Sequence, residues 1–312
     1  MNIVFMGTPD YAVKTLEAVI NAGHNVSAVF AQPDKPVGRK HILTAPPVKV
    51  CALTHNIPVF QPDTLKNEEV EEQLRQLNPD VIVVVAYGKL LPESILNIPK
   101  YGCVNGHASL LPKYRGASPI QWCIVCGESE TGVTTMLMDK GMDTGDILKT
   151  VTVKIGEEET AEQLFERLSN ISATLMTDTL DALEKGKITP IEQNEADATY
   201  APIIKKEMAL LDFKKTATEL HNAVRGYYSW PCAHFFLNGK RIKVISAKIA
   251  DKTESVAGTV ISNSEKLIIA CGNNTSLEIT ELQAEGSKQM TAKQFLCGNS
   301  IELGTVVGDI DG

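Results

Sequence analysis

The feature that most constrains the fold is a continuous apolar, mostly β-branched run, VIVVVAY, at residues 81–87. Such a short run is typical of a strand that is covered on both faces, as in the middle of a parallel sheet. Shorter strand patterns alternate with helical patterns on both sides of it, at 2–7, 25–32, 58–61, 103–109 and 133–139. The alternation predicts an open, mostly parallel α/β sheet in the first 155 residues.

Two helix starts can be read from local signals. Thr8 directly follows the first strand pattern, so we expect its side chain to cap a helix whose first residue is Pro9. Thr160 and Gln163 have the spacing of a capping box, which predicts a helix from there to about Leu183.

The rest of the chain predicts a second domain. Residues 187–206 lose periodicity and read as a linker, a helical pattern follows at 214–226, and five short strand patterns separated by turns come after it. Closely spaced strands of this kind predict a small β-barrel. We therefore expect a catalytic domain at 1–187, a linker at 188–206 and a C-terminal domain at 207–312.

The composition excludes several classes of protein. No stretch approaches the roughly 20 apolar residues of a membrane helix, and the N-terminus has no basic leader, so we expect a soluble cytoplasmic protein. The seven cysteines follow no disulfide pattern. Cys123 and Cys126 form a lone C-x-x-C inside a helical pattern, without a second pair at metal spacing, which favours packing and predicts no metal site.

Polar residues at the end of one strand pattern suggest chemistry. Asn105 and His107 are two residues apart, so they project from the same face of a strand, where an amide and an imidazole could stabilise one oxyanion. Further on, Asp139, Asp143 and Asp146 lie around two glycines, and a loop Asp could orient the His107 ring. On spacing alone, such a histidine is more often structural, and Asp143 could equally be a turn former.

Three ordered motifs carry a family resemblance: Asn105-x-His107-x-Ser109-Leu-Leu-Pro112, Lys113-Tyr-Arg-Gly116, and Met142-Asp-Thr-Gly145. In this combination, the chain resembles the formyltransferases that use 10-formyltetrahydrofolate, over essentially its whole length. The resemblance implies a Rossmann-like catalytic domain followed by an OB-like barrel, in agreement with the strand patterns. It also implies that the donor substrate is 10-formyltetrahydrofolate and that no metal takes part.

The resemblance further implies roles for individual residues. The triad of the family corresponds to Asn105, His107 and Asp143. The tetrahydrofolate-binding positions would be Ser109, Leu110, Leu111, Pro112, Tyr87, Gly88, Leu90 and Asp139. The chain departs from the family at Gly106, where an apolar residue is usual, and glycine loosens a strand.

Within the family, the resemblance implies that the acceptor is the α-amino group of methionine esterified to initiator tRNA. We also expect the enzyme to be a monomer. The net charge of −8 argues against nucleic-acid binding unless cations gather locally. The C-terminal 106 residues hold eleven Lys and Arg against twelve Asp and Glu, so most of the excess negative charge lies elsewhere. We expect tRNA contacts from Lys35, Arg39, Lys40, Lys205, Lys206, Lys240, Arg241 and Lys243, with Lys49, Lys113 and Arg115 as further candidates.

Three alternatives remain open at this point. The same donor could serve another amine, such as a nucleotide-linked amino sugar, or the enzyme could hydrolyse formyltetrahydrofolate by using water. A non-catalytic binding module built on the barrel would not explain the combination of Asn105, His107 and Asp143.

Overall fold

The computed structural model describes residues 1–38 and 41–308 and contains two compact units. The first consists of Met1–Pro119, Glu130–Lys154 and Phe165–Ala201. The second combines Ile120–Ser129 and Ile155–Leu164 with the chain from Pro202 onward. Residues 188–201 of the expected linker therefore pack with the first unit, and residues 202–206 with the second.

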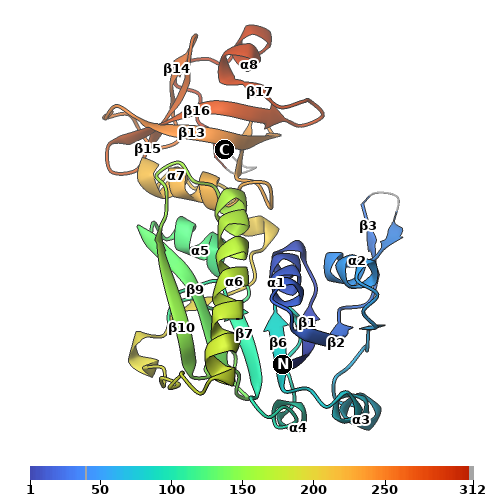
Figure 1. Ribbon diagram of the computed structural model, residues 1–312. Coiled ribbons are helices and arrows are strands. Elements are labelled where there is room, and N and C mark those ends of the chain that lie inside the picture. Colours follow the sequence, from blue (N-terminus) through green and yellow to red (C-terminus); the bar gives the residue numbers. More distant parts are fainter. Residues whose placement is uncertain (39–40, 309–312) are drawn as a thin grey trace. The chain divides into compact units, whose positions relative to one another are not determined.

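A seven-stranded sheet forms the centre of the first unit (Figure 1). The order is β10-β9-β7-β6-β1-β2-β5, with β6 in the middle and all of its residues buried. The pairs from β7 to β5 are parallel, and β9 and β10 add two antiparallel neighbours. The strands are β1 (Asn2–Gly7), β2 (Asn25–Phe30), β5 (Val59–Phe60), β6 (Val81–Val85), β7 (Cys103–His107), β9 (Glu130–Leu137) and β10 (Ile147–Lys154). The predicted α/β class is confirmed.

Helices cover both faces of this sheet. Val4, Met6, Ile82 and Val84 form one core cluster with residues of α3 (Glu68–Leu77) and α4 (Glu93–Leu96). On the opposite face, a Cβ built on Gly7 would point at α1 (Asp10–Asn21), and one built on Gly106 would point at α6 (Ala161–Glu184). Because side chains alternate along a strand, Asn105 and His107 point away from α6.

The two expected helix starts have different outcomes. The capping box is confirmed, since the Gln163 N–H donates to Thr160 Oγ1 (3.3 Å) and the Thr160 N–H donates to Gln163 Oε1 (3.0 Å). The Thr8 cap is wrong: α1 begins at Asp10, with Pro9 as its N-cap and no side-chain cap. The Thr8 hydroxyl instead donates to the carbonyl oxygen of Tyr87 (3.1 Å), in the loop after β6.

Smaller elements of the first unit complete the frame of the site. The short strand β3 (Lys35–Val37) pairs antiparallel with β4 (Ile42–Thr44), and α2 (Pro47–Thr54) follows β4. The two-residue strand β8 (Arg115–Gly116) pairs in parallel with β11 (Tyr200–Ala201). This pairing places a segment from beyond α6 beside the chain that follows β7.

The second unit is an antiparallel sheet with helices packed on it, as predicted for an OB-like domain. Its strands follow the order β12-β13-β16-β15-β14, with β17 paired to β16, and they enclose an apolar core that includes Phe213, Phe235 and Leu220. The elements are α5 (Pro119–Val125), η2 (Lys206–Ala209), α7 (Ala217–Gly226), β12 (His234–Leu237), β13 (Lys240–Ala250), β14 (Val260–Asn263), β15 (Leu267–Cys271), β16 (Thr275–Ala284), β17 (Met290–Thr291) and α8 (Ala292–Gly298). Among residues 1–38 and 41–308, no helix has both the length and the apolar character needed to cross a membrane.

Candidate active site

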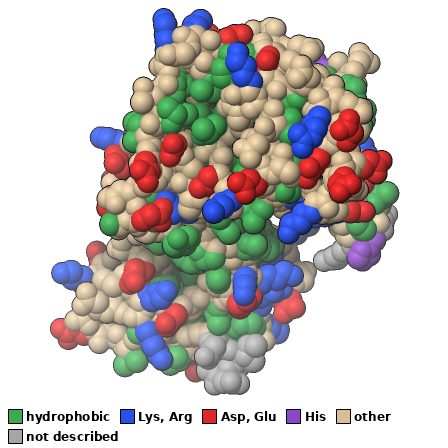
Figure 2. Space-filling view, turned by 90° about the horizontal axis from the view of Figure 1, so that it is seen from below, with side chains coloured by type: hydrophobic (Ala, Val, Ile, Leu, Met, Phe, Trp, Pro, Cys, Tyr) green, Lys and Arg blue, Asp and Glu red, His purple; other side chains and the backbone are tan. Residues whose placement is uncertain are grey.

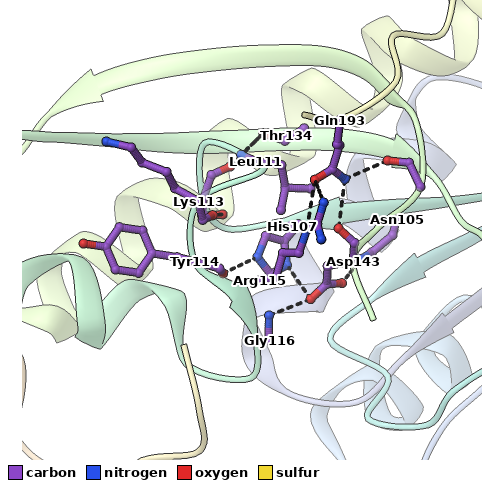
Figure 3. Close-up of polar contacts among 12 residues, drawn as sticks. Asn105, His107, Leu111, Lys113, Tyr114, Arg115, Gly116, Thr134, Asp143 and Gln193 are labelled. Atoms are coloured by element: carbon purple, nitrogen blue, oxygen red, sulfur yellow. Dashed lines mark hydrogen bonds and ion pairs between the residues drawn. The ribbon is translucent and has the colours of Figure 1, made fainter. Parts of the chain in front are cut away.

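The three residues expected to carry the chemistry meet at one place (Figure 3). Asp143 Oδ2 lies 3.6 Å from His107 Nδ1, and Asn105 Nδ2 donates to Asp143 Oδ1 at 3.4 Å. The backbone N–H of Gly116 donates to Asp143 Oδ2 at 2.8 Å. Asn105 and His107 are mostly buried, while the Asp143 side chain keeps 15% of its exposure. The carboxylate is thus held between the two strand residues and β8.

One hydrogen bond defines the tautomer that the His107 ring adopts when it is neutral. Nε2 lies 2.9 Å from the carbonyl oxygen of Tyr114, and a carbonyl can only accept, so Nε2 carries a proton. In the neutral ring, Nδ1 therefore has a lone pair, and it is the atom that faces Asp143. A proton taken up at Nδ1 would produce an imidazolium beside a carboxylate, which is a favourable arrangement for acid–base chemistry.

Asp143 reaches this position from an unexpected direction. Because β9 runs antiparallel to β7, the loop after β9 starts beside the beginning of β7, where the Met138 N–H donates to Cys103 O (2.8 Å). The loop then turns back toward Asn105, and Asp143 adopts a left-handed backbone with φ of 56°. A Cβ at Gly145 would lie 1.8 Å from Leu137 O, so only glycine allows this close return.

Gln193 binds the backbone of the same loop, and Arg115 binds Gln193 (Figure 3). Gln193 Nε2 donates to the carbonyl oxygens of Asp143 (2.8 Å) and Gly145 (2.7 Å), and its Oε1 accepts from two nitrogens of Arg115. Arg115 is fully buried and makes two further hydrogen bonds to Glu195. Gln193 was not among the residues expected to form the site, because in the sequence it is only a polar residue in a segment without periodicity.

The stretch expected to bind tetrahydrofolate is tied to the protein at several points. Ser109 is fully buried, and its hydroxyl donates to Lys113 O at 2.6 Å. Thr134 of β9 donates to Ser109 O (2.7 Å) and accepts from the Leu111 N–H (3.2 Å). Leu111 is buried, Leu110 and Pro112 are half-buried, and the Leu111–Pro112 peptide is cis. Ser109 therefore shapes the loop with its side chain.

The other expected folate positions belong to two loops. The carbonyl of Tyr87 accepts from Thr8 Oγ1 and from Gln32 Nε2 (3.0 Å), and burial raises the pKa of the Tyr87 hydroxyl to about 12. Gly88 has a positive φ, and Leu90 is exposed. Asp139 braces its own loop, because its carboxylate accepts from the Gly141 N–H (3.0 Å) and from Thr144 Oγ1 (2.7 Å).

The residues expected to contact tRNA differ in accessibility. Arg39 and Lys40 lie outside the described residues. Those that are exposed or half-buried are Lys35, Lys205, Lys206, Lys240, Arg241 and Lys243, and Lys113 is also exposed. Figure 2 shows a face on which basic and acidic side chains alternate and do not separate into large areas of one charge.

One of the further basic candidates is wrong, and a second is engaged in contacts within the protein. Arg115 is inaccessible to RNA, because it is fully buried and its guanidinium is bonded to Glu195 and Gln193. Lys49 is half-buried and bound to Asp34 (2.9 Å) and to Gln61 (2.7 Å), so its contact with tRNA stays a prediction. Hydrogen bonds from Gln61 and from Lys49 lower the pKa of the Asp34 carboxyl group. Both cations hold protein segments in place.

The site can supply two functions that acyl transfer needs. Asn105 offers amide N–H groups for a developing oxyanion, and His107 with Asp143 can accept and return a proton. In the part of the chain that the structure describes, no group of three or more His, Cys, Asp or Glu side chains has the arrangement of a metal site. The sheet and this polar cluster define a Rossmann-like protein with the equipment of a group transferase.

Comparison with known proteins identifies the family. Residues 1–180 match the family described as formyl transferase, and residues 203–300 match the C-terminal domain of formyl transferase. The chain therefore belongs to the formyl transferase family.

Similar proteins extend over the full length. The chain is 49% identical to a methionyl-tRNA formyltransferase of Lachnospira eligens, over 99% of this chain and 100% of the relative. It is 47% identical to that of Caldanaerobacter subterraneus subsp. tengcongensis, over 98% and 100%. A solved N-formyltransferase of Helicobacter canadensis, in complex with folinic acid and dTDP-3-aminofucose, has a TM-score of 0.68 at 20% identity, over 90% of this chain and 98% of that one. The last similarity concerns the fold alone.

Proposed function

We propose that this enzyme transfers the formyl group of 10-formyltetrahydrofolate to the free α-amino group of methionine carried by initiator tRNA, in support of translation initiation. The observation that carries the proposal is the meeting of Asn105, His107 and Asp143 at the end of β7. The relatives that are nearly half identical over the whole chain bear the name of this activity, which favours this acceptor over others.

Asn105 would stabilise the charge that develops on the formyl oxygen. When the amine attacks the formyl carbon, a C–N bond forms and the carbonyl oxygen becomes an oxyanion. One N–H of the Asn105 amide already points at Asp143, which fixes the plane of the amide and aims its second N–H. A fixed donor of this kind stabilises the transition state without reorganising.

His107 would transfer the proton. Its Nδ1 can accept the proton of the attacking amine, directly or through a water molecule, while Nε2 remains bonded to Tyr114 O. Asp143 then faces the imidazolium and stabilises its charge. The bond between the formyl carbon and the folate nitrogen breaks next, and the same Nδ1 returns the proton to that leaving nitrogen, so the enzyme ends in its starting state.

The acceptor would be recognised through exposed or half-buried cations. Arg241 and Lys243 alternate with the core residues Ile242 and Val244 on β13, so they share the outer face of the sheet. Burial lowers the pKa of the neighbouring His234, and the charges of Arg241 and Lys243 lower it further. Lys35, Lys205, Lys206 and Lys240 would add phosphate contacts, as would Arg39 and Lys40 by sequence.

The quaternary state and location complete the proposal. One chain supplies all three residues of the catalytic cluster, so we propose that the enzyme works as a monomer, which light scattering during size-exclusion chromatography would test. Because its acceptor is a component of translation, the proposed location is the cytoplasm.

The direct test is formyl transfer from the folate to charged initiator tRNA, with charged elongator tRNA and a nucleotide-linked amino sugar as competing acceptors. We expect Asn105→Ala and Asp143→Asn to reduce turnover at least ~100-fold, the scale of losing an oxyanion donor or an acid–base group. Near-normal turnover of the Asp143→Asn enzyme would contradict the proposed roles. Faster transfer to the sugar, or hydrolysis of formyltetrahydrofolate without any amine, would show that the acceptor is the sugar or water and not methionyl-tRNA.

A further inference from the structure

We infer that Gln193 is a positioning residue: it fixes the loop that presents Asp143 to His107, and buried Arg115 orients it for this task. The inference rests on the proposed function and extends it to a residue that does not touch the reacting atoms. Gln193 is 6% exposed and lies in the segment after α6, about 50 residues along the chain from Asp143.

The hydrogen bonds leave one orientation of the Gln193 amide. Arg115 has only donors, so the atom that faces its Nε (3.1 Å) and terminal nitrogen (2.9 Å) must be Oε1. The carbonyls of Asp143 and Gly145 can only accept, so the nitrogen must face them. Both hydrogens of the amide and both lone pairs of its oxygen are thereby used.

This grip acts on a backbone that needs support. Asp143 has a φ of 56°, a left-handed conformation that L-residues other than glycine seldom adopt, although Asp tolerates it better than most. Gln193 holds the carbonyls on both sides of Thr144, so it fixes the turn that carries the carboxylate. The side chain of Asp143 is then directed by the Gly116 N–H and by Asn105.

Arg115 makes the grip rigid. Its guanidinium is fully buried and has a two-point contact with Glu195 at 2.9 and 2.7 Å, and this hydrogen bonding raises its pKa. A fixed Arg115 leaves Oε1 of Gln193 no alternative direction. Because β8 contains both Arg115 and Gly116, the same short strand orients Gln193, which binds the loop backbone, and donates a hydrogen bond to the Asp143 carboxylate.

The discriminating variant is Gln193→Glu. A glutamate keeps an oxygen for Arg115 and adds a favourable charge, so the buried cation remains paired and we expect the fold to persist. Its second oxygen, however, would face two carbonyl oxygens, and the loop would be released. Gln193→Met, which keeps the approximate size and loses every hydrogen bond, tests the same grip independently. The matched control is Gln294→Glu in α8, where the capping oxygen that Thr291 uses is retained.

We expect Gln193→Glu to lower kcat about 10- to 100-fold, the effect of misplacing a catalytic group by roughly 1 Å, with little change in the KM for tRNA. In a double-mutant cycle with Asp143→Asn, the losses should not multiply, because Gln193 acts through Asp143. Multiplied losses, or a kcat within threefold of that of Gln294→Glu, would overturn the inference.

A second readout needs no turnover. In protein labelled with ¹⁵N-glycine, the amide resonance of Gly116 reports the hydrogen bond to Asp143 Oδ2. We expect it to move in Gln193→Glu and in Gln193→Met, and to stay in place in Gln294→Glu. An unmoved resonance in both Gln193 variants would reject the positioning role. An inactive wild-type enzyme would reject the proposed function and leave this measurement to decide the inference.

Discussion

Gly106 gives the sharpest test of how α6 packs behind the active site. It lies between Asn105 and His107 on β7, and its hydrogen side faces α6. A Cβ built there would lie 3.0 Å from Ser172 Oγ, 3.4 Å from Met176 Cε and 3.6 Å from Val85 Cγ2. The backbone of Gly106 does not have a positive φ, so only space opposes a side chain.

The distances set the expected cost of Gly106→Val. A single methyl group is opposed mainly by the Ser172 hydroxyl, and restricting the unfolded chain stabilises by about 0.4–1 kcal/mol, so Gly106→Ala should be close to neutral. Valine adds two more carbons to the same space, and overpacking of this kind costs roughly 1–3 kcal/mol. Ser172→Ala removes the nearest atom and should restore about 1 kcal/mol in the valine variant, but not in the wild type.

Hydrogen exchange of the β7 amides measures the local free energy of opening, which is suitable for a protein with two compact units. We expect the free energy of opening that is lost in Gly106→Val to be partly regained in Gly106→Val/Ser172→Ala. The kcat values should follow the same order, because Asn105 and His107 are the two neighbours of the substituted residue. Equal stability of Gly106→Val and the wild type, or no coupling to Ser172, would refute the packing described for this face.

Three further predictions test other parts of the structure. Hydrogen bonding to Arg115 lowers the pKa of the Glu195 carboxyl group, so the pair stabilises the protein above the ordinary glutamic acid pKa and ceases to do so as the pH falls through the lowered value. The unfolding midpoint of Glu195→Gln should therefore be lower than that of the wild type at neutral pH and approach it as the pH falls below the ordinary glutamic acid pKa; a constant difference would contradict this. A thiol reagent should modify the exposed Cys126 and Cys297 rapidly and Cys103 slowly, because burial raises the pKa of Cys103 to about 12; mass spectrometry would detect the reverse order. Arg241→Ala should weaken tRNA binding and reduce the salt slope by about 1, whereas exposed Lys187→Ala should leave both unchanged.

Much of the fold followed from periodicity because the relevant forces are local. The apolar run at 81–87 predicted a central strand, and β6 is the middle strand of the sheet with every residue buried. Alternation placed Asn105 and His107 on one face, and the structure brings both to Asp143. The capping box at Thr160 was equally local and equally successful.

The failures involve partners that are distant in sequence. Thr8 had the identity and the position of a cap, yet its hydroxyl bonds to Tyr87, 79 residues away. Arg115 was expected to contact RNA because a sequence shows a charge but not the burial of that charge or the acid that pairs with it. Gln193 gave no pattern at all, since its partners become neighbours only through long-range pairing: the antiparallel bridge between Ile147 and Ile191 brings it to Asp143 and Gly145, and β8 beside β11 brings it to Arg115.

The two loops beside Asn105 and His107 are held in the same way. In each, a side chain from elsewhere donates to a backbone carbonyl: Gln32 and Thr8 to that of Tyr87, and Gln193 to those of Asp143 and Gly145. A carbonyl is present whatever side chain its residue carries, so this anchoring is indifferent to most substitutions within the loops. Substitution of the anchors removes a donor that no loop residue replaces. The positions that maintain the geometry of the site therefore include residues remote from it in sequence, and the loops themselves remain free to adapt to their substrates.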